Sequence, residues 1–167
     1  MQTFLPYPNF RKTAKCLDYR RLGKQRVEVL QLLNTFLPSY KSKAWVNHPA
    51  RLMWKHNVVC LAVYGLAICD EWLTRGYKDT CYDKIMSIGF ELAEIGAKPW
   101  EFYRPQLELE HVAVEPSWLG NEDFHASHRS NLIRKDWVWY DQFGWTEPNN
   151  LQYIWPGPSL HIYKNMV

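Results

Sequence analysis

The chain has 167 residues and a net charge of +3, with 47% hydrophobic and 22% charged residues. These values are typical of one globular domain with a sizeable core, and they exclude a largely disordered chain. No stretch predicts a membrane span or a signal peptide. The 4 cysteines form no CxxC pair and fit no zinc motif, so we expect free thiols and a cytoplasmic protein.

Helical patterns dominate the first part of the chain. Residues 1–10 contain two prolines and are expected to be extended. A first helix is predicted from Thr13, as its N-cap, to residue 37, with a bend at Gly23 and an end before Pro38. A second helix is predicted from 49 to 75, with Asn47 or His48 as its cap. Gly76 is expected to end this second helix.

The second half of the chain is less regular. A third helix is predicted from 79–80 to Gly96, followed by an irregular segment over 97–120. A fourth helix is predicted over 121–135, before an aromatic cluster and a proline-rich tail. No run alternates as a strand does. The fold class predicted is all-α: a compact single-domain bundle of three to four helices over 1–167, with long irregular loops and an aromatic-rich C-terminal segment.

One residue of the first helix does not follow the helical pattern. In LGKQRVEVLQLL (22–33) the apolar residues fall on one side and the polar residues on the other. Arg26 lies beside the apolar stripe. A partly buried guanidinium needs a carboxylate or a phosphate as its partner. The sequence leaves both partners open: a phosphate of a bound nucleic acid, or Asp18 or a carboxylate elsewhere in the chain.

The N-terminal third of the chain carries an excess of positive charge. Two acidic residues in this part of the chain, Asp18 and Glu28, are outnumbered by seven basic ones: Arg11, Lys12, Lys15, Arg20, Arg21, Lys24 and Arg26. The excess favours phosphate or nucleic-acid binding, although a solvated helix face is the alternative. Glu28 is either an i,i+4 ion-pair partner of Lys24 or a functional carboxylate among basic residues.

The histidines offer further candidate contacts. His125 and His128 form an HxxH pair on the fourth helix, but no further ligand has metal-site spacing. We expect polar contacts to phosphate or sugar from His125, His128, Arg129 and Lys135, with a simple surface helix as the alternative. His48 could bind an anion at a helix N-terminus or serve only as a cap. P-loop, Rossmann and GxSxG motifs are absent from the sequence.

The aromatic content of the chain is high, with 9 Trp, 10 Tyr and 7 Phe. We expect most of these rings to be core and a few to stack on bases or sugars. The sequence does not decide between these roles for Trp45, Trp118 and Trp139.

Four stretches, in this order and spacing, resemble the pyrimidine-dimer DNA glycosylase family of the phage endonuclease V type. They are LGKQRVE (22–28), WLTRGYKDT (72–80), SHRSNLIRK (127–135) and WYDQFG (139–144). The likeness covers about residues 1 to 145, and the tail 146–167 has no counterpart that we can place. The resemblance implies an all-α DNA repair enzyme that binds damaged duplex DNA, kinks it and extrudes a nucleotide.

The resemblance also implies a mechanism. In the family an N-terminal α-amine attacks C1′ of the damaged nucleotide, the base leaves, a Schiff base forms and the strand is cut by β-elimination, with help from a glutamate. An α-amine has a pKa of about 8, against about 10.4 for lysine, so more of it is nucleophilic at neutral pH. Carried onto this chain, the roles fall to Met1 and Glu28 as catalytic groups, and no metal or cofactor is expected. The expected DNA contacts are Arg21, Lys24, Arg26, His48, His125, His128, Arg129 and Lys135.

The chain departs from the family pattern at two places. Gln2 follows Met1, and a bulky second residue normally keeps the initiator methionine, so the amine would be that of Met1 itself. Val27 separates Arg26 from Glu28, whereas the family's arginine and glutamate are adjacent. Two alternatives therefore remain: a non-catalytic DNA-binding module, and a glycosylase that uses water activated by Glu28 and cuts no strand. In each case we expect a monomer that binds double-stranded DNA.

Overall fold

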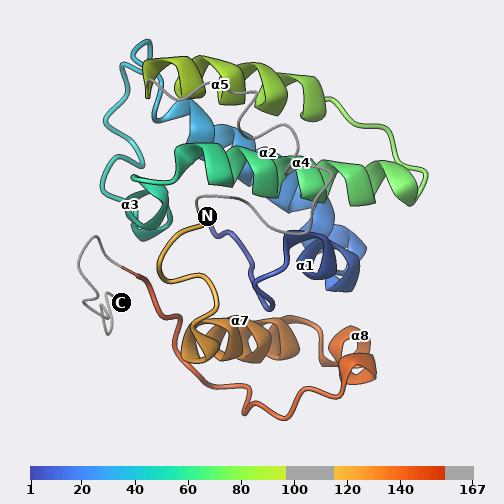
Figure 1. Ribbon diagram of the computed structural model, residues 1–167. Helices are drawn as coiled ribbons and strands as arrows, with labels where there is room; N and C mark the ends of the chain where they lie inside the picture. The colour runs from blue at the N-terminus through green and yellow to red at the C-terminus, as the bar shows by residue number, and fades with distance from the viewer. Residues whose placement is uncertain (97–114, 157–167) are drawn as a thin grey trace.

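The computed structural model describes residues 1–96 and 115–156, and it is all-helical over these ranges, with no strand (Figure 1). The prediction of an all-α fold is confirmed. The helices are α1 (Phe10–Cys16), α2 (Tyr19–Asn34), α3 (Pro49–Trp54), α4 (Val58–Thr74), α5 (Tyr82–Ile95), α7 (Glu122–Lys135), α8 (Trp137–Tyr140) and the 3₁₀ helix η2 (Asp141–Phe143).

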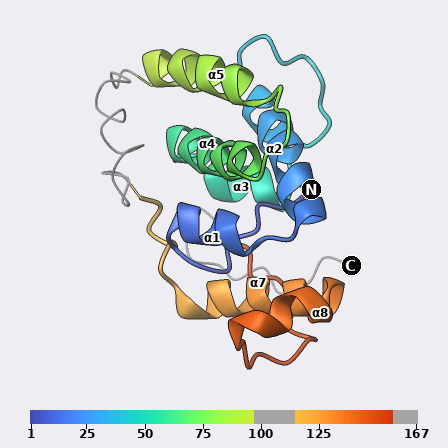
Figure 2. The same ribbon diagram turned by 90° about the vertical axis from the view of Figure 1, so that its right-hand side faces the viewer.

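The helices form two groups with the start of the chain between them. Helices α2, α4 and α5 pack together, and α1 packs against α4. Helices α7 and α8 lie at the other side of the molecule, and the N-terminal segment (residues 1–8) runs between the two groups in both views (Figures 1 and 2). None of the described helices is both long and apolar enough to cross a bilayer.

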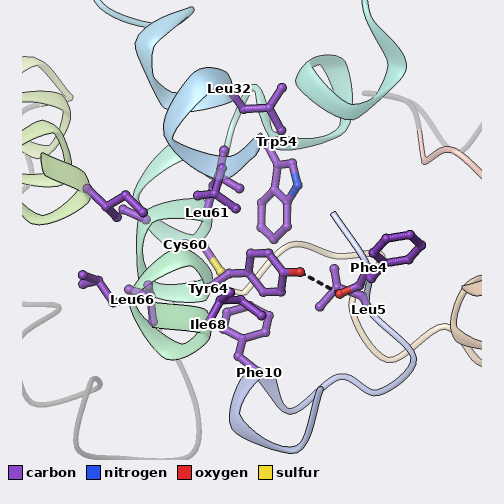
Figure 3. Close-up of a cluster of buried hydrophobic side chains, with 14 of the residues drawn as sticks. Phe4, Leu5, Phe10, Leu32, Trp54, Cys60, Leu61, Tyr64, Leu66 and Ile68 are labelled. Carbon is purple, nitrogen blue, oxygen red and sulfur yellow. Dashed lines mark hydrogen bonds between the residues drawn. The ribbon is translucent and has the colours of Figure 1, made fainter. Parts of the chain in front are cut away.

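The core is built around α4, which is buried over most of its length. The ring of Tyr64 stacks on Trp54 with centroids 6.1 Å apart, and Phe10 meets Tyr64 edge-on at 5.4 Å (Figure 3). Trp118 also belongs to this core, being 7% exposed and 5.0 Å from Trp54 between ring centroids. By contrast, Trp45 and Trp139 are 47% and 37% exposed.

The helix predicted from 13 to 37 is two helices. The break lies at Leu17–Asp18, both extended, and the prediction of a bend at Gly23 was wrong. The physical reason is capping, because the Asp18 side chain accepts from two backbone N–H groups in the first turn of α2 and so competes with a continuous helix. Asn9, rather than Thr13, is the cap of α1.

The other predicted helices fare differently. The helix predicted over 49–75 breaks at 55–57 into α3 and α4, and His48 caps α3 as one of the two candidates. The predicted ends at Gly76 and Gly96 and the whole of α7 agree with the structure. Of the segment predicted to be irregular, 97–114 lies outside the described residues, as do residues 157–167 of the tail.

Gly65 marks the closest approach of α4 to its neighbours. A Cβ atom there would lie 2.6 Å from Cγ1 of Val29 on α2 and 3.2 Å from Cδ1 of Ile85 on α5. The absence of a side chain at this position therefore allows α4 to pack closely against both helices.

We predict that Gly65→Ala lowers the free energy of unfolding by about 1–3 kcal/mol, because overpacking forces the three helices apart. Urea unfolding measures the change. Gly96→Ala is the matched control, since a Cβ there would meet its nearest neighbour, the carbonyl oxygen of Leu92, at 3.4 Å. Equal stabilities of the two variants would contradict the close packing at Gly65.

Candidate active site

The N-terminal segment forms no regular secondary structure, yet residues 2–6 are buried. Side chains from the two helix groups therefore satisfy its backbone. On one side, Gln25 of α2 accepts from the Phe4 N–H at 2.7 Å and donates to the Gln2 carbonyl at 2.5 Å. The Tyr64 hydroxyl lies 2.8 Å from the Phe4 carbonyl (Figure 3). The segment is thus held by α2 and α4 along one edge.

Helix α7 holds the other edge. The Leu5 N–H donates to Nδ1 of His128 at 3.2 Å, and Nδ1 of His125 lies 2.7 Å from the Leu5 carbonyl. Arg129 donates to the Pro6 carbonyl at 2.9 Å. Burial lowers the pKa of His125, and it lowers the pKa of His128 to about 3. Both histidines are therefore neutral at physiological pH.

These contacts bring the first residue to Glu28. The Met1 amine lies 3.9 Å from Oε1 of Glu28, and the Gln2 N–H donates to Oε2 at 3.2 Å. The Met1 side chain is 2% exposed and packs against the core, although the residue as a whole is only partly buried. The exposed part of Met1 is therefore its main chain, which carries the amine. The thioether is an anchor in the core.

Besides Met1 and Gln2, two side chains of α2 contact the Glu28 carboxylate. Gln25 donates to its Oε2 at 2.9 Å, and Nζ of Lys24 lies 3.5 Å from its Oε1. The Glu28 side chain is 10% exposed, whereas that of Lys24 is 74% exposed. A fixed carboxylate beside a primary amine can accept and return a proton, which is general acid–base chemistry.

A cavity of about 480 Å³ opens over this pair. Its floor includes Met1 and Glu28, and its edge carries four cations, here called the basic rim: Arg20, Arg21, Lys24 and Lys135. Partial burial and the neighbouring cations Arg21, Arg134 and Lys24 lower the pKa of Lys135. Such a rim attracts an anionic ligand. The volume is within the range of small-molecule and cofactor sites.

The C-terminal tail supplies the aromatic part of the cavity wall. Tyr153 and Trp155 line it together with Phe4. The ring of Trp155 meets His48 edge-on, with centroids 6.0 Å apart. Sequence analysis missed both tail residues and also Gln25, since nothing local to a tail or to a glutamine on a helix indicates which cavity it faces.

The structure brings together some of the predicted site residues. Met1, Glu28, Arg21, Lys24 and Lys135 all line the cavity. Arg21 also contacts the end of α7: it donates to the Lys135 carbonyl at 3.1 Å, and its Nη1 lies 3.7 Å from Oδ2 of Asp136. This contact joins the start of α2 to the end of α7.

Other predicted contacts lie beneath the surface. His125, His128 and Arg129 are 1%, 0% and 7% exposed. Arg129 is paired with Glu122 and with Glu147. Their burial favours a supporting role over direct contact with a ligand. His48 caps α3 by accepting from the Ala50 N–H at 3.1 Å. Burial lowers the pKa of His48, the charge of the Met1 amine lowers it further, and Glu28 acts in the opposite direction.

The structure answers the question posed by Arg26. Its guanidinium pairs with Asp79 and lies over the ring of Trp72, 4.2 Å from the centroid. The Arg26 side chain is 12% exposed and the Asp79 side chain 3%. The carboxylate alternative is thus the observed one, and the carboxylate is Asp79, elsewhere in the chain. Arg26 has its partner within the protein, and its contact with DNA stays a prediction.

Asp79 also precedes α5, and its side chain accepts from the backbone N–H groups of Cys81 and Tyr82 at the start of that helix. Burial alone would raise the pKa of this carboxyl, but its backbone hydrogen bonds and the Arg26 guanidinium outweigh burial and lower it. Among the described residues, no group of three or more His, Cys, Asp or Glu is placed to hold a metal ion.

Comparison with known proteins gave one family. A family profile described as pyrimidine dimer DNA glycosylase matches residues 1–85, about half of the chain. No curated protein and no solved structure matches the chain. The matched residues include the N-terminal segment, Glu28 and three cations of the basic rim, but not Lys135, α7 or the tail.

The Arg26–Asp79 pair predicts that Asp79→Asn lowers the free energy of unfolding by about 3–5 kcal/mol, because it leaves a buried guanidinium unpaired. The pKa of Asp79 is lowered in the fold, so its contribution is present above the unfolded pKa of about 3.9 and is lost as the pH falls through the lower folded value. Urea unfolding from neutral to acidic pH measures both effects. Asp83→Asn, at an exposed position in the first turn of α5, should change stability little; a similar loss there would contradict the assignment.

Proposed function

The chain belongs to the pyrimidine dimer DNA glycosylase family, and from this premise we propose that it excises damaged pyrimidines, such as pyrimidine dimers, from duplex DNA. The Met1 amine is the proposed nucleophile and Glu28 the catalytic carboxylate. The observation that supports this most is the position of the amine, 3.9 Å from Glu28 on the floor of a cavity with a basic rim. DNA is the substrate of a DNA glycosylase, and the finer chemistry is our proposal.

The proposed reaction starts with the neutral amine. Its lone pair forms a bond to C1′ of the damaged nucleotide, the C1′–N bond to the base breaks, and the base leaves with the bonding electrons. Glu28 accepts the proton that the amine loses. Glu28 returns this proton to O4′ as the sugar ring opens, which leaves a Schiff base between the amine nitrogen and C1′, and the departing base takes a proton from water. Loss of a C2′ proton to Glu28 then expels the 3′ phosphate by β-elimination, and water hydrolyses the Schiff base to free the amine.

The basic rim is the proposed contact for the DNA backbone. Arg20, Arg21, Lys24 and Lys135 surround the cavity mouth, and cations placed in this way contact phosphates and fix the register of the DNA. The amine and Glu28 lie inside the cavity, so the reacting sugar has to leave the base stack to reach them.

A second primary amine lies close to Glu28. Nζ of Lys24 is 3.5 Å from Oε1, but its side chain is 74% exposed. The Met1 amine is preferred for two reasons: its side chain is anchored in the core, and an α-amine is intrinsically less basic than a lysine. The experiment below separates these two nucleophiles.

We predict that borohydride traps a covalent adduct between the protein and a duplex carrying an abasic site, and that peptide mass mapping locates it on Met1. A second duplex carrying a cyclobutane dimer should give the same adduct after base release. Lys24→Arg keeps the charge of the basic rim but removes the primary amine of residue 24, so the adduct on Met1 should persist in this variant.

Other outcomes would replace the proposal. An adduct on Lys24 that disappears in Lys24→Arg would keep the enzyme and move the nucleophile. Base release without any adduct or strand cut would indicate a water-using glycosylase, and binding alone would indicate a DNA-binding module.

We predict that Glu28→Gln slows adduct formation by about 10²-fold or more, the usual contribution of a general acid–base group. DNA affinity, measured by fluorescence anisotropy, should be kept or increased, because the substitution removes a negative charge from the cavity that the basic rim lines. Glu94→Gln, at an exposed position of α5, is the matched control. Adduct formation at the wild-type rate in Glu28→Gln would exclude Glu28 as the catalytic carboxylate.

A further inference from the structure

The HxxH pair of α7 has no role in the chemistry proposed above, and its surroundings are unusual. His125 and His128 are one helical turn apart and both face Leu5 of the N-terminal segment. The Leu5 N–H donates to Nδ1 of His128 at 3.2 Å, while Nδ1 of His125 lies 2.7 Å from the Leu5 carbonyl. Two side chains thus bind both polar groups of one residue.

The protonation of each ring follows from its partners. Nε2 of His125 accepts from the Gly120 N–H at 3.0 Å, so in the neutral ring the proton is on Nδ1, which donates to the Leu5 carbonyl. Nδ1 of His128 accepts from Leu5, so its proton is on Nε2. The two rings therefore differ in tautomer, one being a donor and the other an acceptor for the same residue. Backbone groups thus bind both Nδ1 atoms and Nε2 of His125, while Nε2 of His128 is buried without a hydrogen-bond partner.

We propose that His125 and His128 are positioning residues for the Met1 amine: together they clamp Leu5 and set the register of the N-terminal segment against Glu28. The proposal rests on the function proposed above, in which this amine is the nucleophile. It assigns to α7 a part in the reaction although none of its histidines reaches the cavity.

The geometry explains why the register matters. Extended chain advances about 3.3 Å per residue, and a shift by one residue turns alternate side chains to the opposite side. Such a slip would move the amine by several ångströms and take the Met1 side chain out of its place in the core. A misplacement of about 1 Å at a reacting group can cost 10²-fold in rate.

The clamp acts together with the opposite edge of the segment. Phe4 is bound by Gln25 and Tyr64 of α2 and α4, while Leu5, the next residue, is bound by α7. Consecutive residues are therefore fixed by two separate helix groups. A segment that is bound on both edges in this way has one register, whereas a segment bound by α2 and α4 alone could slide or lift at Leu5.

The experiment compares two kinds of substitution at each histidine. His128→Leu and His125→Leu remove the hydrogen bonds to Leu5, whereas His128→Asn and His125→Asn place an amide oxygen or nitrogen near the position of Nδ1. We measure the single-turnover rate of N-terminal adduct formation on abasic duplex, the DNA affinity, the thermal midpoint, and hydrogen exchange of the Leu5 amide.

The clamp predicts a slow Leu5 amide in the wild-type protein, which tests the contact without any substitution. In the leucine variants, exchange at Leu5 should rise and the adduct rate should fall by about 10²-fold at saturating DNA, with an affinity within about twofold of wild type. The asparagine variants should recover at least a tenth of the wild-type rate. A purely structural role would instead lower the rate in proportion to the unfolded fraction, which the thermal midpoint reveals.

The possible failures are distinguishable. An N-terminal adduct that forms at the wild-type rate in folded His128→Leu would overturn the clamp and leave the proposed function intact. Absence of an N-terminal adduct in the wild-type protein would overturn the proposed function and the clamp with it. If the leucine variants do not fold, a fast Leu5 amide in the wild-type protein, or no recovery in either asparagine variant, overturns the clamp.

Discussion

The structure depends on how a buried stretch of chain without secondary structure satisfies its own backbone. Buried N–H and C=O groups need partners, and the N-terminal segment has no neighbouring strand or helical turn to provide them. Gln25 and Tyr64 provide them from one helix group, and His125, His128 and Arg129 from the other. The segment therefore joins the two groups, and the same contacts that complete the fold deliver the amine to Glu28. Stability and chemistry share one set of hydrogen bonds.

The cavity has walls of different kinds. Its floor and much of its basic rim come from residues 1–85, the part of the chain that matches the family. Lys135, Tyr153 and Trp155 come from the end of α7 and from the tail, outside that match. In the proposed reaction the first group transfers protons and binds phosphate, while Tyr153 and Trp155 of the second group add aromatic surface to the cavity. A difference in substrate choice between members of such a family would reside in the second group, since it shapes the space above the amine and leaves the reacting groups unchanged.

Much of this arrangement could be predicted from local sequence, and the rest could not. Helical periodicity and caps predicted the fold class, α7 and the ends at Gly76 and Gly96, because these signals act within a few residues. The same reasoning failed at Asp18, where a side chain that looks like one charge among many is a helix cap. It also could not show that Arg26 finds its carboxylate 53 residues away, or that the tail returns to the cavity. Those partners are set by tertiary packing, which no local pattern encodes.

The spacing of Arg26 and Glu28, which is one residue wider than in the family pattern, has a simple consequence on a helix. Two residues apart means about 200° of rotation, so the side chains leave α2 on nearly opposite sides. Arg26 points to Trp72 of α4 and to Asp79, which precedes α5, and Glu28 points to the N-terminal segment. The ion pair therefore fixes the rotation of α2 about its axis, and that rotation aims the carboxylate at the amine. Arg26 contributes to the site by orienting the helix that carries Glu28. The guanidinium beside the apolar stripe and the carboxylate two residues later therefore act together.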